Sequence, residues 1–384
     1  MKYSIPSEWN GLKNSIYEEY QRDGVFFLDH AYLIGLHNKT GAFARTLEPI
    51  IAAAEELTQD TDAALYALFL YRAMEDRSLF LKHLPSVMIP DDNFPFLAFL
   101  AFTPYIERLY DYLCEKNLPR DVIQATVGQF EDCLFLYQER FGRLGMNKRY
   151  FDHMQRYVDC NVLNIGRLRF EIHVLKDACM LESRKTGNQV LFPISGEMNE
   201  CGLYADTPPI DPHGTVFHAF FEETETDYVG TPIGADGKCQ KTPIRLSKSE
   251  YFVRLPVGAH CLAVHIPAKG AFTREACEES YTRAKEIFSL LFPDIEIKAF
   301  RCHSWMMAPE LKEILREGSN LLTFQAPYLK YPCRTRGEDI LNFVFKTTST
   351  DYSTLPEDTS LQRALKQRYL SGNLLYEYNG IFTI

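Results

Sequence analysis

Residues 260–318 constrain the fold most narrowly, because two short apolar runs there flank an amphipathic helix pattern. The apolar runs lie at 260–267 and 297–305, and the helix pattern lies between them at 273–292. Within this pattern, apolar residues recur at steps of three and four, as they do on the buried face of a helix. Two strands joined by a helix of this length predict a parallel β-α-β unit, and a second helix is expected at 308–318.

The turn at 268–272 lies where the first strand ends and the helix begins. Free backbone N–H groups gather at such turns, and open α/β sheets bind anionic ligands there. Lys269 adds a positive charge, and Gly270 gives the backbone freedom to turn. The turn is therefore a candidate phosphate site; a strand-to-helix connection without a ligand is the alternative.

Polar side chains follow both strands of this unit. The ends of parallel strands meet at one edge of a sheet, so we expect His265 to lie near residues 302–305. Pro267 has no N–H, and the strand pairing is expected to stop or splay near it. His265 would then be a general base or a ligand contact, or else a histidine bonded to backbone. Ser304 would donate a proton to a leaving group or cap the next turn.

Two further side chains have both a chemical and a structural interpretation. Cys302 precedes a histidine and would be a nucleophile, although a cysteine in an apolar strand is more often a core residue. Glu171 lies in a strand pattern at 166–174, on one face with Arg167, Arg169 and His173. It would act as a general base beside a cleft, and would otherwise pair with an arginine on a solvated face.

The chain has 384 residues, which favours two domains over one core. Residues 1–158 carry helix patterns with short connections and predict a helical N-terminal domain. Residues 159–384 predict an α+β domain with a mixed sheet flanked by helices and a C-terminal helical tail. Helices are expected at 60–81, from 103 onward, from 120 to 141, at 148–159 and at 360–370, and further strands at 190–194, 215–221, 244–247, 251–255, 321–329 and 340–345.

Composition argues against several functional classes. The net charge is −10 with no basic run longer than two residues, so neither nucleic acid nor a membrane surface is an expected partner. The most apolar stretch, 94–106, is shorter than the roughly 20 residues of a membrane span. The N-terminus shows no apolar signal region, and we expect a cytoplasmic protein.

No motif predicts a metal site or a serine-hydrolase elbow. The ten cysteines form no CxxC pair and are expected to be reduced thiols. His213, His218 and Glu222 would make a metal cluster only in a weaker alternative, since they lack the spacing of known metal motifs. We therefore expect no metal.

The chain resembles, over nearly its whole length, a bacterial acyltransferase family with a helical N-terminal domain and a GNAT-like C-terminal domain, and the resemblance rests on six segments in order. The segments are Ile165–Glu171 (IGRLRFE), Val264–Pro267 (VHIP), Ser280 with Ala284, Cys302–Trp305 (CHSW), Ser319–Asn320, and Leu355–Ala364 (LPEDTSLQRA).

The resemblance implies transfer of an acyl group from a thioester such as acyl-CoA to an amine or hydroxyl of a small acceptor. In GNAT enzymes the pantetheine arm pairs with one of two splayed strands, and the pyrophosphate binds the following turn. The catalytic candidates are then Glu171 or His265 as the base and Ser304 or His303 as the acid. The cofactor-binding candidates are Ile266, Ala268, Lys269, Gly270, Ala271, Thr273 and Trp305.

The turn differs from the usual GNAT pattern, Gln/Arg-x-x-Gly-x-Gly/Ala. Here it has Gly270 alone and no matching glutamine or arginine. An acyl-carrier arm as the donor remains an alternative to coenzyme A. A non-catalytic protein that binds a small ligand on the same fold is an alternative to the enzyme.

Overall fold

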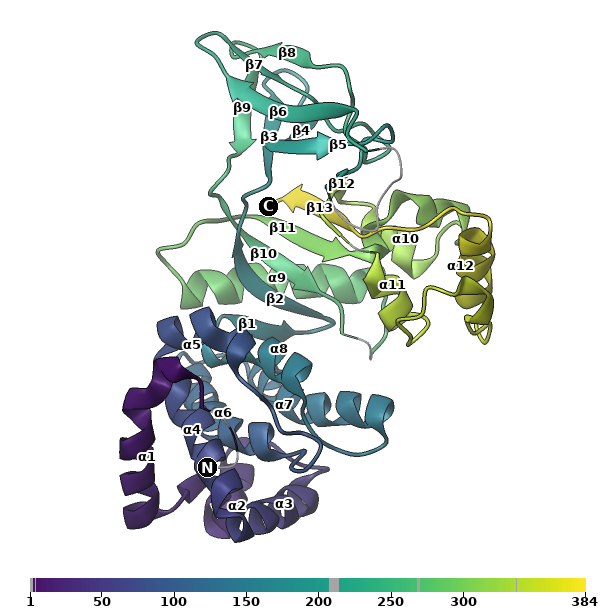
Figure 1. The fold of residues 1–384 in the computed structure, drawn as a ribbon. Coiled ribbons are helices and arrows are strands. Elements are labelled where there is room, and N and C mark those ends of the chain that lie inside the picture. Colours follow the sequence, from purple (N-terminus) through teal and green to yellow (C-terminus); the bar gives the residue numbers. More distant parts are fainter. Residues whose placement is uncertain (1–2, 4, 207–213, 268–269, 336) are drawn as a thin grey trace. The chain divides into compact units, whose positions relative to one another are not determined.

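The chain is described by a computed structural model that covers residues 3, 5–206, 214–267, 270–335 and 337–384. It divides into two compact units, Met1–Ile165 and Gly166–Ile384 (Figure 1).

The first unit is helical, as predicted. Its α-helices are α1 Asn10–Asp23, α2 His30–Thr40, α3 Leu47–Gln59, α4 Thr61–Ala73, α5 Arg77–His83, α6 Leu97–Glu115, α7 Arg120–Phe141 and α8 Lys148–Val158, and the unit ends with strand β1 Val162–Ile165. Helix α7 ends where predicted, because Gly142 adopts the left-handed conformation that closes a helix. Among the residues described, no helix is both long enough and apolar enough to cross a bilayer.

Helix α6 begins earlier than the sequence predicted. Pro104 was expected in the first turn, but it lies buried inside the helix, in the most apolar stretch of the chain. A proline there removes the N–H that would bond the carbonyl of Leu100. The Thr103 hydroxyl donates to that carbonyl instead, at 2.7 Å, so the apolar core helix continues through the proline.

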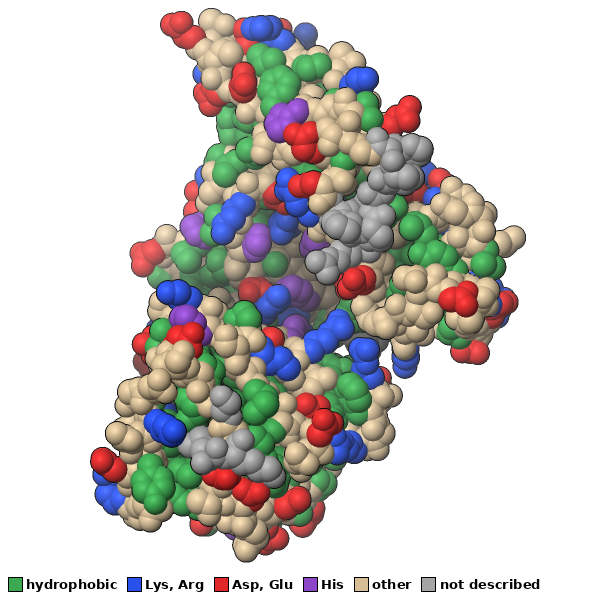
Figure 2. Space-filling model, viewed as in Figure 1, with side chains coloured by type: hydrophobic (Ala, Val, Ile, Leu, Met, Phe, Trp, Pro, Cys, Tyr) green, Lys and Arg blue, Asp and Glu red, His purple; other side chains and the backbone are tan. Residues whose placement is uncertain are grey.

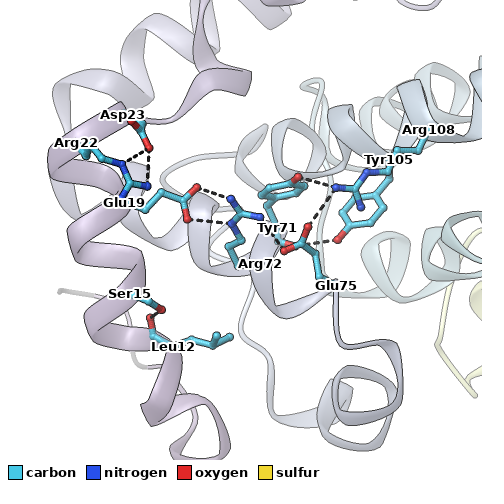
Figure 3. Close-up of polar contacts among 10 residues, drawn as sticks. All are labelled: Leu12, Ser15, Glu19, Arg22, Asp23, Tyr71, Arg72, Glu75, Tyr105 and Arg108. Atoms are coloured by element: carbon cyan, nitrogen blue, oxygen red, sulfur yellow. Dashed lines mark hydrogen bonds and ion pairs between the residues drawn. The ribbon is translucent and has the colours of Figure 1, made fainter.

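The single helix predicted at 60–81 is two helices. Helix α4 ends at Ala73, and Asp76 starts α5 by accepting from the Leu79 N–H at 3.1 Å. Between them, Glu75 accepts from Arg72 at 2.8 Å and from Arg108 of α6 at 3.2 Å (Figure 3). The other side of the Arg72 guanidinium donates to Glu19 of α1 at 2.7 Å, so this ion-pair network joins three helices.

The second unit is a mixed α+β domain, as predicted. In its main sheet the strands run in the order β2-β10-β11-β13-β12, and only β10 and β11 among them pair in parallel. These strands are β2 Leu168–Val174, β10 His260–His265, β11 Ile297–Ser304, β12 Leu329–Pro332 and β13 Tyr378–Thr383. The two smaller sheets contain β3 Ala178–Ser183, β4 Gln189–Pro193 and β9 Tyr251–Leu255, and β5 Ser195–Met198, β6 Phe217–Glu223, β7 Asp227–Gly230 and β8 Ile244–Ser247.

Helix α9, Arg274–Leu291, connects β10 to β11 and covers one face of the main sheet (Figure 1). Its Tyr281 ring packs against Phe170, Phe300 and Phe382, with centroids 4.7 to 6.1 Å apart. Because side chains alternate along a strand, the residues next to these aromatic residues in each strand point to the opposite face of the sheet. That opposite face carries the polar candidates Glu171, His265 and His303.

Three predictions for the C-terminal part are wrong. Residues 320–325 form α10 and residues 338–343 form α11, where strands were expected. Ser319 starts α10 by accepting from the Leu322 N–H, and such a cap outweighs β propensity in a short apolar run. The helix expected at 308–318 is only a 3-10 turn, Pro309–Glu313. Helix α12, Ser360–Leu370, lies where predicted and begins with a capping box of Thr359 and Gln362.

Candidate active site

The parallel strands β10 and β11 part before they end. Their paired register runs from His260 opposite Ile297 to Ala263 opposite Arg301 and stops there. β10 continues along β2 to His265, and β11 continues along β13 to Ser304. Neighbouring residues of a strand direct their backbone groups to opposite sides, so one of Val264 and His265 directs its N–H and C=O into the gap.

Glu171 and His265 lie on one side of this gap, which we call the first bank. Their side chains meet across the β2–β10 pair, with Oε2 3.3 Å from Nε2. Both are partly exposed, at 21% and 34%, so a ligand in the gap can reach them. The structure thus brings together two residues that the sequence placed about 90 positions apart. Glu171 and His265 form an acid–histidine pair suited to proton transfer.

His303 lies on the other side of the gap, the second bank. Its Nδ1 lies 3.2 Å from Oδ1 of Asn379 on β13, and its ring keeps exposed surface. The pKa of His303 is lowered, first because the surrounding protein displaces water from the ring and then because Arg301 adds a positive charge nearby. The ring is therefore neutral at physiological pH. Figure 2 shows histidine side chains and Lys or Arg side chains gathered over these central strands.

The turn after β10 leads into the N-terminus of α9. Thr273 caps this helix by accepting from the Ala276 N–H at 3.3 Å, so it has a structural role as well as its predicted place in the phosphate site. Gly270 has φ +99, a conformation that favours glycine. Ile266 is partly buried and Ala271 is exposed. The candidates Ala268 and Lys269 lie outside the described residues.

Arg167 is a cation beside this turn that the sequence did not single out as a ligand. Its guanidinium lies 5.0 Å from the centroid of the Phe272 ring, and a Cβ added at Gly270 would be 3.6 Å from its Cδ. Atoms Nε and Nη1 are buried, and neither has a hydrogen-bond partner among the described residues. A buried charged donor without a partner is costly unless an anion or water satisfies it. Burial lowers the pKa of Arg167, but arginine starts so high that it stays charged.

The remaining candidates near the end of β11 have structural roles. The Ser304 Oγ accepts from the Met306 N–H at 3.1 Å and so caps the turn Trp305–Met307. Trp305 is only 6% exposed and packs in the interior. Cys302 is 1% exposed on the α9 side of the sheet, and burial raises the pKa of its thiol to about 12. A thiol with that pKa is not a nucleophile at neutral pH.

Within the described ranges, no group of three His, Cys, Asp or Glu side chains could hold a metal ion. His218 pairs instead with Glu197 across β5 and β6 at 3.0 Å. His213 lies outside the described residues.

Residues 162–382 match the model of the GNAT-like C-terminal domain family. No curated protein matches the sequence.

Several solved structures share the fold. One is an acyltransferase in complex with decanoyl-CoA and teicoplanin, with TM-score 0.60, 17% identity, and coverage of 92% of this chain and 88% of that one. Another is an acyltransferase in complex with CoA and 10C-teicoplanin, with TM-score 0.59, 16% identity, and coverage of 92% and 87%. A third, with decanoyl-CoA alone, has TM-score 0.57, 15% identity, and coverage of 97% and 99%. At these identities the likeness establishes the fold. The family match covers more than half of the chain, which therefore belongs to the GNAT-like C-terminal domain family.

Proposed function

We propose that this protein is an acyltransferase that moves an acyl group from an acyl-CoA thioester to an amine or hydroxyl of a small acceptor. The observation that carries the proposal is the gap after Ala263 and Arg301, with His265 on one bank and His303 on the other. An extended pantetheine arm fits between two strands that have stopped pairing, because it offers amide groups to unpaired backbone. Its thioester would then lie between the two histidines.

The donor's diphosphate would bind at the turn that follows β10. The first N–H groups of α9 and the backbone around Gly270 favour an anion there. Arg167 supports this placement, because its buried Nε and Nη1 atoms need an acceptor. The guanidinium of Arg167, the residue before β2, would supply the charge that the turn itself provides in GNAT enzymes.

The chemistry follows from this placement. The acceptor nitrogen or oxygen attacks the thioester carbon, a new C–N or C–O bond forms, and the C–S bond breaks. One proton leaves the acceptor and one proton ends on the thiol of coenzyme A. A histidine paired with a carboxylate, as His265 is with Glu171, can relay such protons.

Binding is tested first by thermal unfolding of the full chain with CoA, decanoyl-CoA and pantetheine. Decanoyl-CoA is chosen because solved structures of this fold hold it. A ligand at about 100 times its Kd adds about 2.7 kcal/mol to the stability of the folded state, which raises Tm by several degrees. If none of the three ligands raises Tm, the proposal is overturned.

Turnover is tested by release of the free thiol from decanoyl-CoA with a panel of amino and hydroxyl acceptors. His265→Gln should lower the rate by about 10²-fold, the usual contribution of a general base or acid. His218→Gln is the matched control, because His218 also pairs with a glutamate but lies on a different sheet. A chain that binds CoA yet releases no thiol with any acceptor would instead support a non-catalytic binding protein.

A further inference from the structure

On the second bank, formed by β11 and β13, a chain of hydrogen bonds connects Asp177 to His303. It starts at Asp177, whose carboxylate accepts from three donors: Nη2 of Arg301 at 2.7 Å, Nδ2 of Asn379 at 3.2 Å and the Tyr331 hydroxyl at 3.3 Å. The Arg301 side chain is 12% exposed and the Asp177 side chain 31%, so this charge pair is partly shielded from water. Hydrogen bonds to ionised groups in such surroundings are strong and hold their geometry.

Asp177 fixes the orientation of the Asn379 side-chain amide. A carboxylate can only accept hydrogen bonds, so the NH₂ group of Asn379 must face Asp177. The amide oxygen then faces the other way, toward Nδ1 of His303 at 3.2 Å. Asn379 is 1% exposed, so bulk water does not compete for its polar atoms.

The Asn379 oxygen in turn selects one tautomer of the His303 ring. An amide oxygen accepts, so Nδ1 of His303 must carry the hydrogen. In a neutral ring the lone pair then lies on Nε2, and Nε2 has no partner among the described residues. The ring thus offers a proton acceptor on the same face of the sheet as His265.

We propose that Asn379 and Asp177 position His303 so that its Nε2 atom takes the proton from the acceptor during acyl transfer. This rests on the proposed function and assigns His303 the role of base, where the sequence favoured the role of acid. The acceptor's N–H or O–H bond breaks, its hydrogen moves to Nε2, and the freed electron pair forms the bond to the thioester carbon. The C–S bond breaks, the thiolate leaves with its electron pair and takes up one proton, and Nε2 gives up the proton that it received, so the protons balance.

A nearby histidine shows what distinguishes His303. Nε2 of His173 lies 3.1 Å from Nη1 of Arg301, and a guanidinium can only donate. His173 therefore has the same tautomer, but its Nε2 lone pair is already engaged. The charged groups around His303 are Arg301 on its own strand, Asp177, and Asp339 of α11.

The tautomer can be measured directly by 15N NMR on the full chain labelled at histidine. Protonated and unprotonated ring nitrogens have well-separated shifts, and loss of signals in His303→Gln identifies this residue. In the wild-type protein without substrate, we expect Nδ1 protonated and Nε2 unprotonated at neutral pH. A wild-type ring protonated at Nε2 overturns the proposal, even if the protein binds CoA and transfers acyl groups.

Two variants test whether Asn379 positions His303. Asn379→Leu removes the oxygen that selects the tautomer, and should shift His303 toward the Nε2-protonated form and lower kcat by about 10²-fold with KM for acyl-CoA unchanged. Tyr331→Phe is the matched control, because it removes one donor to Asp177 and leaves Asn379 in place. An unchanged tautomer in a folded Asn379→Leu variant refutes the positioning role. If the tautomer is as expected but no acyl transfer occurs, the proposed function and the role of His303 as base fail, and only the positioning of the ring by Asn379 stands.

Discussion

His265 and His303 stand at equivalent positions on two strands that have parted. Each lies two residues beyond the last pair, Ala263 and Arg301, and side-chain alternation puts both on one face of the sheet. Each ring has its own polar partner: Glu171 for His265, and Asn379 for His303. The two banks can therefore be tested by separate substitutions.

On the first bank, Glu171→Gln removes the carboxylate that pairs with the His265 ring. We expect kcat for acyl transfer to fall by about 10²-fold, with little change in the Kd for CoA, since proton transfer is impaired and the strand gap is kept. Steady-state thiol release measures the rate. Glu197→Gln is the control, because Glu197 pairs with His218 on another sheet. An equal loss in both variants would mean that the Glu171–His265 pair has no special role.

Arg167→Met should weaken CoA binding without affecting ligands that lack the diphosphate. A charge-assisted hydrogen bond contributes about 1.5–3 kcal/mol, so the Kd for CoA should rise by about 10- to 100-fold. Calorimetric titration with CoA and with pantetheine separates the two effects. Arg184→Met is the control, because Arg184 also lies over a phenylalanine ring, at 5.2 Å from the Phe252 centroid. Equal weakening of pantetheine would contradict the placement of the diphosphate.

The pH dependence of kcat/KM should report His303. A base acts in its neutral form, so the rate rises as the pH passes upward through its pKa. That pKa is lowered from 6.5 by burial and by Arg301, so the rising limb should be centred below pH 6.5, with full activity already at neutral pH. Initial rates between about pH 5 and 8 in wild type and His303→Gln measure this limb. A limb centred above 6.5, or one that persists in the variant, contradicts the assignment.

The first bank could be predicted from the sequence because its signals are local. The apolar runs, the Thr273 cap and Pro267 lie within one β-α-β unit, and they predict where the strands end and that they splay. Glu171 comes from a strand with clear alternation. Its partner was not predicted, because register between distant strands depends on packing in three dimensions.

On the second bank, the sequence predicted His303 as a candidate, but it did not predict its partner Asn379. Strand β13 carries the dipeptide Asn379-Gly380, which is typical of a turn. The structure keeps Gly380 in the strand because a Cβ there would come within 2.6 Å of Sδ of Met307 and 2.9 Å of the Tyr328 ring. That contact joins segments about 50 to 70 residues apart, and no local pattern encodes it. The contact of Asn379 with His303 is therefore seen only in the fold.

Cys302→Ala should leave acyl transfer nearly unchanged. The thiol is buried on the α9 side of the sheet with a pKa near 12, so it contributes packing and no nucleophile. We expect a loss of about 1 kcal/mol in unfolding free energy, within the range for removing one buried heavy atom. Iodoacetamide should label the exposed Cys114 and Cys201 in the native protein before Cys302. A large loss of turnover in a stable Cys302→Ala variant would restore a chemical role for this residue.

Glu75→Gln tests the ion-pair network of the helical unit. Burial acts to raise the pKa of Glu75, but Arg72 and Arg108 outweigh it and the pKa is lowered in the folded state. The stabilisation from this carboxylate is therefore present above its unfolded pKa, near 4.5, and is lost as the pH falls through the lower folded value. The groups are about one-third exposed, so solvent screening limits the effect to about 1 kcal/mol. Chemical denaturation should show the variant less stable than wild type at pH 7, with the difference shrinking toward pH 4. Glu55→Gln is the control, because Glu55 pairs with an exposed histidine outside this network. A difference that grows as the pH falls would contradict the assigned charge state of Glu75.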